Sequence, residues 1–370
     1  MKQEEQRAPY IFLGVVMLIG SFVLFMTQRS LNDKIATAAE SVLPAELTIT
    51  VIQTPDCPLC FDVESAVSLL REQSVTLLRN DDVLQGSPQA TDLIARYNIS
   101  KLPTVVIEGE VDKEIILSFL EANTEPSGEA RIWSAIPPPF VDAGDGLIAG
   151  LVDVTMITDT RCRVCKDPAA FVDFLVNSVG LVQNSTTTLD ARDPAAKEIL
   201  ASHGIKTAPS VILSQDAEVY AQLIASWGQF GTVAPDGSFV AFLQDPPYIE
   251  VDSGKVRGLT TLTVLTDESC DACYDATTHK SILENTFGIS LTSTATIDSA
   301  STAGKQLITK YKIEQLPTII LSGDGEAYPN LIAAWDTVGS VEDDGSFIFR
   351  NLALMGTYRN LSTGEIVTAQ

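Results

Sequence analysis

The sequence is poor in histidine and in positive charge. Its 370 residues include 2 histidines, and 24 lysines and arginines stand against 48 aspartates and glutamates, for a formal net charge of -24. Such a surface repels the phosphate backbone of nucleic acids, so we expect no nucleic-acid partner. His203 and His279 lack the spacing of metal ligands, and we expect both to be solvated. The sequence therefore predicts neither a bound metal nor a cofactor.

Long uncharged apolar segments are also absent, with one exception near the N-terminus. The uncharged span from Ala8 to Gln28 holds 21 residues. As a helix it would be about 31 Å long, close to the hydrocarbon thickness of a bilayer. We predict a short tail at 1–9, one transmembrane helix at 10–28 and a linker at 29–46.

Cysteine occurs nowhere outside three Cys-x-x-Cys pairs. The pairs are Cys57 and Cys60, Cys162 and Cys165, and Cys270 and Cys273. Each first cysteine is followed 46 or 47 residues later by a proline that opens an apolar run, at Pro103, Pro209 and Pro317. A recurring unit of this size indicates three copies of one domain. We place them at 47–140, 141–248 and 249–370.

Within each copy, the apolar pattern predicts the order β-α-β-α-β. The fold class is therefore α/β, with a central mixed sheet flanked by helices. The first cysteine of each pair is expected at the N-terminus of the first helix. The second and third copies end in a predicted hairpin, at Asp236-Gly237 and Asp344-Gly345, which the first copy lacks. The prolines at 137–139 and at 246–247 are expected to lead into hairpins that feed the next copy.

Together, the first strand, the Cys-x-x-Cys pair and the distant proline resemble the thioredoxin-like superfamily. This resemblance covers nearly everything from Leu47 onward. It implies that the three prolines are cis and face the cysteines. It also implies exposed nucleophiles, Cys57, Cys162 and Cys270, and deeper resolving cysteines, Cys60, Cys165 and Cys273. The proline loop would offer its backbone to an extended substrate as an added strand.

One feature of the thioredoxin family is missing. Thioredoxins place a buried acid six residues before the first cysteine, whereas Val51, Met156 and Val264 stand there in this chain. The internal proton acceptor of the family is therefore absent from all three copies.

Paired thiols predict thiol–disulfide exchange, with protein thiols and disulfides and an unidentified redox partner as partners. A disulfide across two residues closes a small loop and restrains little chain entropy, so a purely structural role is a weak reason for it. Two alternatives stay open. The pairs could be inert disulfides in a non-enzymatic binding or scaffold protein, or they could supply thiolate ligands to a metal.

The orientation of the chain follows from the short tail and from the cysteines. A short tail before a lone anchor usually leaves the bulk of the chain outside the cytoplasm, and locally paired cysteines fit an oxidising compartment. We expect a cytoplasmic N-terminus and extracytoplasmic copies, in the periplasm or at the cell surface. A cleaved signal peptide is the alternative, because Ala36-Thr37-Ala38 resembles a cleavage site.

Local charge predicts a ranking of the three pairs. Arg161, Arg163 and Lys166 surround the second pair, whereas acids surround the third, with no cation in sequence closer than Lys280. Cations stabilise a thiolate and acids destabilise it. We therefore expect the lowest thiol pKa at Cys162 and the least reactive thiol in the third pair.

Overall fold

The computed structural model describes residues 28, 43–243 and 245–368. Within these residues, no helix has both the length and the apolar character needed to cross a membrane. The transmembrane helix expected at 10–28 and most of the linker lie outside the described residues. By compactness the chain divides into two units, between Gly150 and Leu151, and each is described by itself. The first unit has one five-stranded sheet and the second has two. The segments that carry these sheets are called the first, second and third domains below.

The first domain contains the elements β1 to β8. They are β1 (Ala45–Gln53), α2 (Val63–Arg71), β2 (Val75–Leu84), α3 (Pro88–Tyr97), β3 (Lys101–Leu102), β4 (Thr104–Gly109), α4 (Glu114–Asn123), β5 (Thr124–Ser127), β6 (Ala130–Trp133), β7 (Phe140–Asp142) and β8 (Ile148–Ala149). Local sequence sets the helix ends. Asp62 and Ser87 accept hydrogen bonds from first-turn N–H groups, and Asn98 ends α3 in the left-handed conformation.

The second domain repeats this order in β9 to β16. Its elements are β9 (Leu151–Thr158), α5 (Pro168–Phe174) continued by a π-turn (Leu175–Val179), β10 (Val182–Asp190), α6 (Pro194–Ser202), β11 (Thr207–Ala208), β12 (Ser210–Leu213), α7 (Ala221–Ser226), β13 (Gly231–Val233), β14 (Phe239–Phe242), β15 (Tyr248–Glu250) and β16 (Val256–Arg257). Short 3-10 turns at Gln215–Val219 and Trp227–Gln229 flank α7.

The third domain repeats the order again in β17 to β24. Its elements are β17 (Thr260–Thr266), α8 (Thr278–Phe287), β18 (Leu291–Asp298), α9 (Thr302–Tyr311), β19 (Gln315–Leu316), β20 (Thr318–Gly323), α10 (Pro329–Trp335), β21 (Gly339–Val341), β22 (Phe347–Phe349), β23 (Tyr358–Asn360) and β24 (Ile366–Val367). Two 3-10 turns lie at Gly325–Ala327 and Leu352–Leu354.

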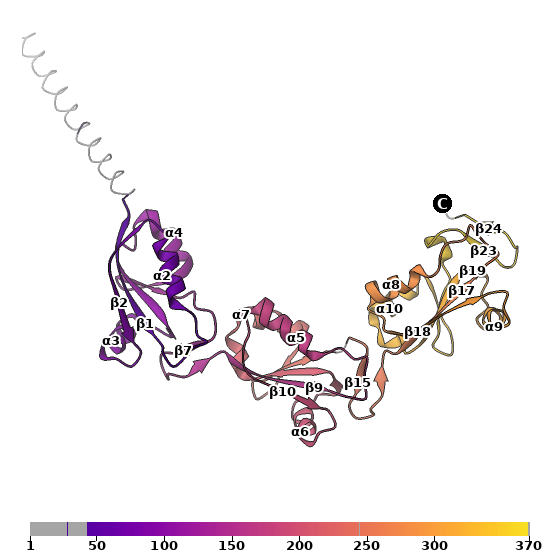
Figure 1. The fold of residues 1–370 in the computed structure, drawn as a ribbon, viewed down its shortest axis with the longest axis horizontal. Coiled ribbons are helices and arrows are strands. Elements are labelled where there is room, and N and C mark those ends of the chain that lie inside the picture. The colour runs from indigo at the N-terminus through magenta and orange to yellow at the C-terminus, as the bar shows by residue number, and fades with distance from the viewer. Residues whose placement is uncertain (1–27, 29–42, 244, 369–370) are drawn as a thin grey trace, which may run out of the picture. The chain divides into compact units, whose positions relative to one another are not determined.

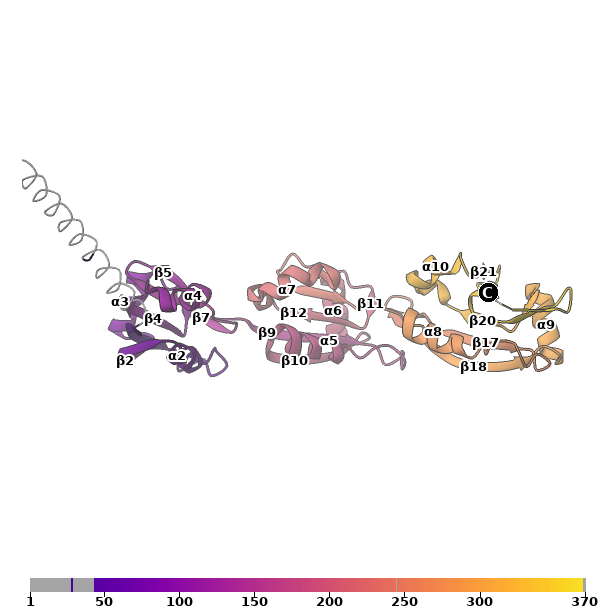
Figure 2. The same ribbon diagram turned by 90° about the horizontal axis from the view of Figure 1, so that it is seen from above.

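Each domain has one five-stranded mixed sheet with the same strand order. The orders are β2-β1-β4-β6-β5, β10-β9-β12-β14-β13 and β18-β17-β20-β22-β21. The first two strands along the chain pair in parallel, and every other pairing is antiparallel. Neighbouring strands of the third sheet can be followed in Figure 2. The mixed α/β class expected from the sequence is confirmed.

Helices cover both faces of each sheet. Figure 1 shows α2 and α4 on one face of the first sheet and α3 on the other, and the same division for α5, α7 and α6 and for α8, α10 and α9. The strand residues between the two layers are buried on both sides, as Ile52, Val106 and Ile107 illustrate. Burial on both faces explains why these strands form continuous apolar runs.

The prediction that the first copy lacks a terminal hairpin is wrong. β5 and β6 pair antiparallel, and Gly128 between them has a φ of 62°. Two features hid this hairpin in the sequence. It has no Asp-Gly turn, and its first strand contains Pro126, which suits only the edge position that β5 occupies.

The hairpins expected after the proline clusters are present. β7 and β8 pair with each other, as do β15 and β16. Each hairpin also joins the preceding domain, in a small sheet of order β3-β7-β8 or β11-β15-β16, and the third domain has its own version, β19-β23-β24. Residues 140–149 therefore pair with the first domain, beyond the boundary expected at residue 140.

A buried tyrosine joins three segments of the third domain. The hydroxyl of Tyr328 donates to the carbonyl oxygen of Gly258 at 2.7 Å and accepts from the N–H of Ser290 at 2.9 Å. Tyr328 is 3% exposed, so water cannot replace these bonds.

We expect Tyr328→Phe to lower the free energy of unfolding of the third domain by about 1–3 kcal/mol, because it leaves two backbone groups unpaired. Chemical denaturation followed through Trp335, with Trp133 and Trp227 replaced by Phe, measures this. Tyr358→Phe is the control, since that hydroxyl bonds to no described residue. Equal stabilities for the two variants would contradict the assignment.

Candidate functional site

All six cysteines are joined in disulfides within their own pairs. The sulfur–sulfur distances are 2.04 Å for Cys57–Cys60, 1.96 Å for Cys162–Cys165 and 2.00 Å for Cys270–Cys273. Each pair lies in a turn that begins three residues before its first cysteine. The cysteine N–H donates to the carbonyl oxygen of Thr54, Asp159 or Asp267, at 3.0 to 3.1 Å. The same turn therefore presents the dithiol in all three domains.

The expectation that the first cysteine begins a helix is wrong. α2 begins at Val63, six positions after Cys57, and α5 begins at Pro168, six positions after Cys162. Asp62 and Asp167 cap these helices with their side chains, and aspartate is among the strongest N-caps. The effect of a helix dipole fades within one turn. Helix termini therefore supply little stabilisation to the first thiolates.

The expected order of exposure is reversed in two domains. Cys57 is 6% exposed and Cys270 is 7% exposed, whereas Cys60 and Cys273 are half-buried. Cys57 packs in the core cluster that contains Leu102 and Val141, and this packing is why it is the deeper one. In the second domain both cysteines are half-buried. An incoming thiol in the first and third domains therefore meets the second cysteine first.

The three prolines follow cis peptide bonds, as the resemblance implies. The Leu102–Pro103, Ala208–Pro209 and Leu316–Pro317 bonds are all cis, and so are Pro138–Pro139 and Pro246–Pro247. In the third domain the sulfur of Cys273 lies 3.9 Å from the carbonyl oxygen of Leu316. In the third domain the fold therefore brings the dithiol beside the proline loop, although the two residues are 43 positions apart in the sequence.

Two of the three cations around the second pair are neutralised. Arg161 forms an ion pair with Asp159 at 2.5 Å, and Lys166 forms one with Asp245 at 3.0 Å. Burial opposes ionisation of Asp159, but the hydrogen bonds from Arg161 outweigh it and hold the pKa of this carboxyl below its usual value. Arg163, exposed between the two cysteines, pairs with no residue in the described part of the chain.

The third pair has a cation that sequence reasoning missed. Arg359 of β23 forms an ion pair with Asp267 at 2.6 Å and donates to the carbonyl oxygen of Ser269 at 3.1 Å. Only the fold reveals this contact, since 92 positions separate Arg359 and Asp267. The expected ranking stays a prediction, but it now depends mainly on Arg163 and Asp271, which lie inside their motifs.

Tyr274 and His279 lie beside the third pair and contact each other. The hydroxyl of Tyr274, the residue after Cys273, donates to the carbonyl oxygen of Pro317 at 3.0 Å and lies 3.2 Å from Nε2 of His279. The expectation that His279 is solvated is wrong, because it is 4% exposed. His279 and Leu283 are the buried residues of α8. Their four-residue spacing places both on one face of the helix, and this spacing could have indicated from the sequence that His279 is buried.

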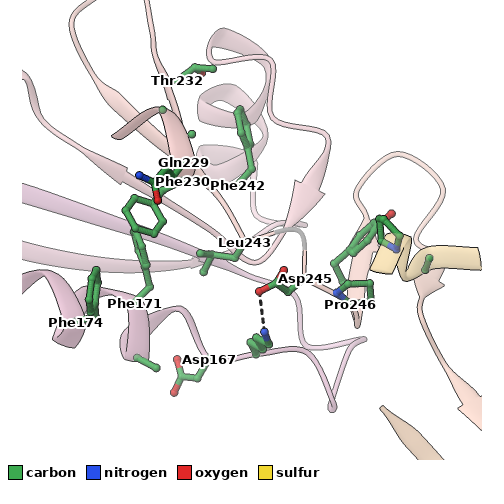
Figure 3. A pocket seen from close by; sticks show the side chains of 17 residues that line it. Asp167, Phe171, Phe174, Gln229, Phe230, Thr232, Phe242, Leu243, Asp245 and Pro246 are labelled. Atoms are coloured by element: carbon green, nitrogen blue, oxygen red, sulfur yellow. Dashed lines mark hydrogen bonds and ion pairs between the residues drawn. The ribbon is translucent and has the colours of Figure 1, made fainter. Parts of the chain in front are cut away.

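An aromatic groove adjoins the second pair. It is lined by Lys166 and Asp167, just after Cys165, and by the rings of Phe171, Phe174 and Phe230, which Figure 3 shows gathered beside one another. The three rings pack on one another, with centroids 5.3 to 6.3 Å apart. They form the outer edge of the second domain's core.

The structure assigns no metal ligands. Within residues 43–243 and 245–368, no three side chains of His, Cys, Asp or Glu come together as a metal site requires.

Neither protein families nor curated proteins match this chain. Solved structures align with it at low similarity. A mutant of the alkylhydroperoxide reductase protein AhpF from Enterococcus faecalis aligns at 14% identity and a TM-score of 0.16, covering 50% of this chain and 88% of that one. ERdj5 aligns at 12% identity and a TM-score of 0.14, covering 88% and 41%. Zinc-bound human ERp44 aligns at 12% identity and a TM-score of 0.13, covering 75% and 81%.

The burial of His279 predicts a pH dependence. Burial lowers the pKa of this imidazole from 6.5 to about 4. Because the unfolded state binds the proton more readily, this contribution to stability is complete above about pH 6.5 and is lost as the pH falls toward 4. The loss is on the order of 3 kcal/mol.

We expect His279→Gln to remove most of the loss in the free energy of unfolding between about pH 6.5 and pH 4. NMR titration of a His203→Gln chain, which retains His279 as its one histidine, measures the pKa directly. A midpoint near 6.5 would show that the imidazole is solvated.

Proposed function

We propose that the chain is a membrane-anchored thiol–disulfide oxidoreductase that acts on exported proteins. One observation carries the proposal: the same dithiol turn and the same cis-proline strand occur together in three domains. In the third domain the sulfur of Cys273 is 3.9 Å from the carbonyl oxygen of the proline loop. The thioredoxin-like resemblance assigns this pairing of features to disulfide exchange.

The chemistry requires a thiolate and an accessible disulfide. A substrate thiolate attacks one sulfur of the pair, the bond within the pair breaks, and the other cysteine leaves as a thiolate. In the first and third domains the half-buried second cysteine, Cys60 or Cys273, is the accessible target. A second thiolate of the substrate then attacks the mixed disulfide, which releases the substrate with a new disulfide and leaves the pair as a dithiol. A disulfide of the redox partner accepts the two electrons and restores the oxidised pair.

A binding or scaffold protein with structural disulfides is the second candidate. Two observations favour it: Cys57 and Cys270 are buried, and the first cysteines are set apart from the helix starts. Both features slow the reaction of a thiol, because reactivity depends on thiolate character and on access.

Reduction potentials separate the two candidates. We make three full-length chains, each retaining one cysteine pair while the other four cysteines are replaced by serine. Alkylation across a glutathione redox titration gives the potential of each pair. For an oxidoreductase we expect at least one value above about -300 mV, the range of catalytic disulfides, with the second pair highest and the third lowest. Values below about -300 mV for all three pairs would favour the scaffold.

The N-terminal segment predicts membrane attachment. We expect the full chain to resist extraction by alkaline carbonate, and the domains to be digested by protease added to spheroplasts. Replacing Leu18 and Ile19 by arginine should release the chain, because each charge at a helix centre costs about 2.5–3.5 kcal/mol on insertion scales. The matched control replaces both residues by alanine. Release of the unsubstituted chain would rule out the anchor.

A further inference from the structure

The residue before each cis proline is already paired with a strand of the same chain. Leu102 is opposite Val141, Ala208 is opposite Ile249, and Leu316 is opposite Arg359. An extended substrate would use this same backbone edge to add itself as a strand. The hairpins that follow the five-stranded sheets therefore occupy the docking edge of all three proline loops.

The register shows that the N–H and the carbonyl oxygen of each of these residues are both hydrogen-bonded to the hairpin strand. In the third domain the N–H of Leu361 donates to the carbonyl oxygen of Glu314 at 2.8 Å. Hydrogen-bonded pairs alternate along an antiparallel ladder. The next such pair is Leu316 with Arg359, which exchanges both of its bonds.

The other two domains have the same register. The N–H of Ala143 donates to the carbonyl oxygen of Ser100, and that of Val251 to the carbonyl oxygen of Lys206, both at 2.9 Å. Leu102 and Ala208 are therefore in hydrogen-bonded pairs too.

The occupying strands are anchored in the cores. Val141 is 4% exposed and belongs to the cluster that contains Cys57, while Ile249 is fully buried in the cluster against which Cys162 packs. Displacing either strand would expose apolar surface, which opposes its exchange for a substrate strand.

In the third domain the occupying strand also holds the dithiol turn. Arg359 binds Asp267 and the carbonyl oxygen of Ser269, which precede Cys270. On the other side of the pair, the N–H of Tyr274 donates to the carbonyl oxygen of Thr357 at 2.8 Å. The segment from Thr357 to Arg359 therefore contacts the chain before and after the disulfide.

In the second domain, too, the hairpin contacts the chain just before the first cysteine, but through different residues. A Cβ at Gly254, in the β15–β16 turn, would lie 2.1 Å from the guanidinium of Arg161. That guanidinium is the one that balances the buried Asp159. The hairpin turn therefore closes against the residue that precedes Cys162.

We propose that each hairpin is a built-in occupant of its proline loop, and that the third dithiol exchanges with small thiols and disulfides rather than with extended polypeptides. This inference rests on the proposed exchange function. A small thiolate attacks the sulfur of Cys273, the Cys270–Cys273 bond breaks, and Cys270 leaves as a thiolate. A second small thiol then attacks the mixed disulfide, releasing a small disulfide and the reduced pair. An extended chain gains the docking edge only when β23 detaches.

Hydrogen exchange tests the occupancy independently of any redox activity. We expect the amides of Leu102, Ala208 and Leu316 in the oxidised full-length chain to exchange at least about 100-fold more slowly than unstructured amides. Exchange at unstructured rates would show that the edges are free and would overturn the proposal.

Reaction rates test the substrate class. In the full-length chain that retains only Cys270 and Cys273, we compare reduction by glutathione with reduction by an unstructured ten-residue peptide containing one cysteine. Arg359→Gln should raise the peptide rate relative to the glutathione rate about tenfold, because it removes a charged hydrogen-bonded contact that holds β23. Lys310→Gln, which removes an exposed ion pair with Asp344 in the same domain, should leave the ratio unchanged.

Arg359→Lys keeps the charge and should give an intermediate ratio. An unchanged ratio in Arg359→Gln, with Leu316 shown by exchange to be released, would overturn the assigned substrate class. If glutathione does not reduce the pair in any variant, exchange at this site fails and so does the substrate class. The protection of Leu316 then still decides whether the edge is occupied.

Discussion

The antiparallel pairing of the first strand with the proline strand is the constraint on which the rest of each domain depends. Its register is the same three times: Ile52 is opposite Thr104, Ile157 is opposite Ser210, and Leu265 is opposite Thr318. Each first-strand residue lies five positions before a cysteine, and each partner directly follows a cis proline. This register brings two segments together that are more than 40 positions apart in the sequence. A shift of one residue would turn every side chain of the strand to the opposite face of the sheet.

Spacing and residue type sufficed to predict this framework. Three dithiols on a domain-sized period, each with its distant proline, predicted three copies of a mixed α/β unit, and the thioredoxin-like resemblance implied three cis bonds. Those bonds are present at Pro103, Pro209 and Pro317. Such features are local or periodic, and a single sequence displays them directly. The missed hairpin at Gly128 shows the limit, because its turn lacks the residues that usually mark one.

The properties of the site were less predictable, because they arise from contacts between distant segments. Charge counted along the sequence gave the third pair no nearby cation, yet β23 brings Arg359 to Asp267. The exposure of the cysteines depends on packing as well. Cys57 is buried because Leu102 and Val141 complete the cluster around it, and Val141 lies in a hairpin predicted only as a connector. Distance along the sequence therefore predicted neither the cation beside the third pair nor the burial of Cys57.

The second and third domains balance a buried carboxylate at the same position in different ways. Asp159 and Asp267 each lie three residues before a first cysteine, and each accepts an N–H two residues onward, from Arg161 and from Ser269. In the second domain the countercharge is local, since Arg161 also supplies the guanidinium. In the third domain it comes from the hairpin strand that occupies the proline loop. Detaching that strand would leave a carboxylate that is 7% exposed without its partner, a cost that the second domain avoids. Access to the third dithiol therefore requires separation of the Asp267–Arg359 ion pair, whereas the second dithiol keeps its charge balance whether its hairpin is attached or not.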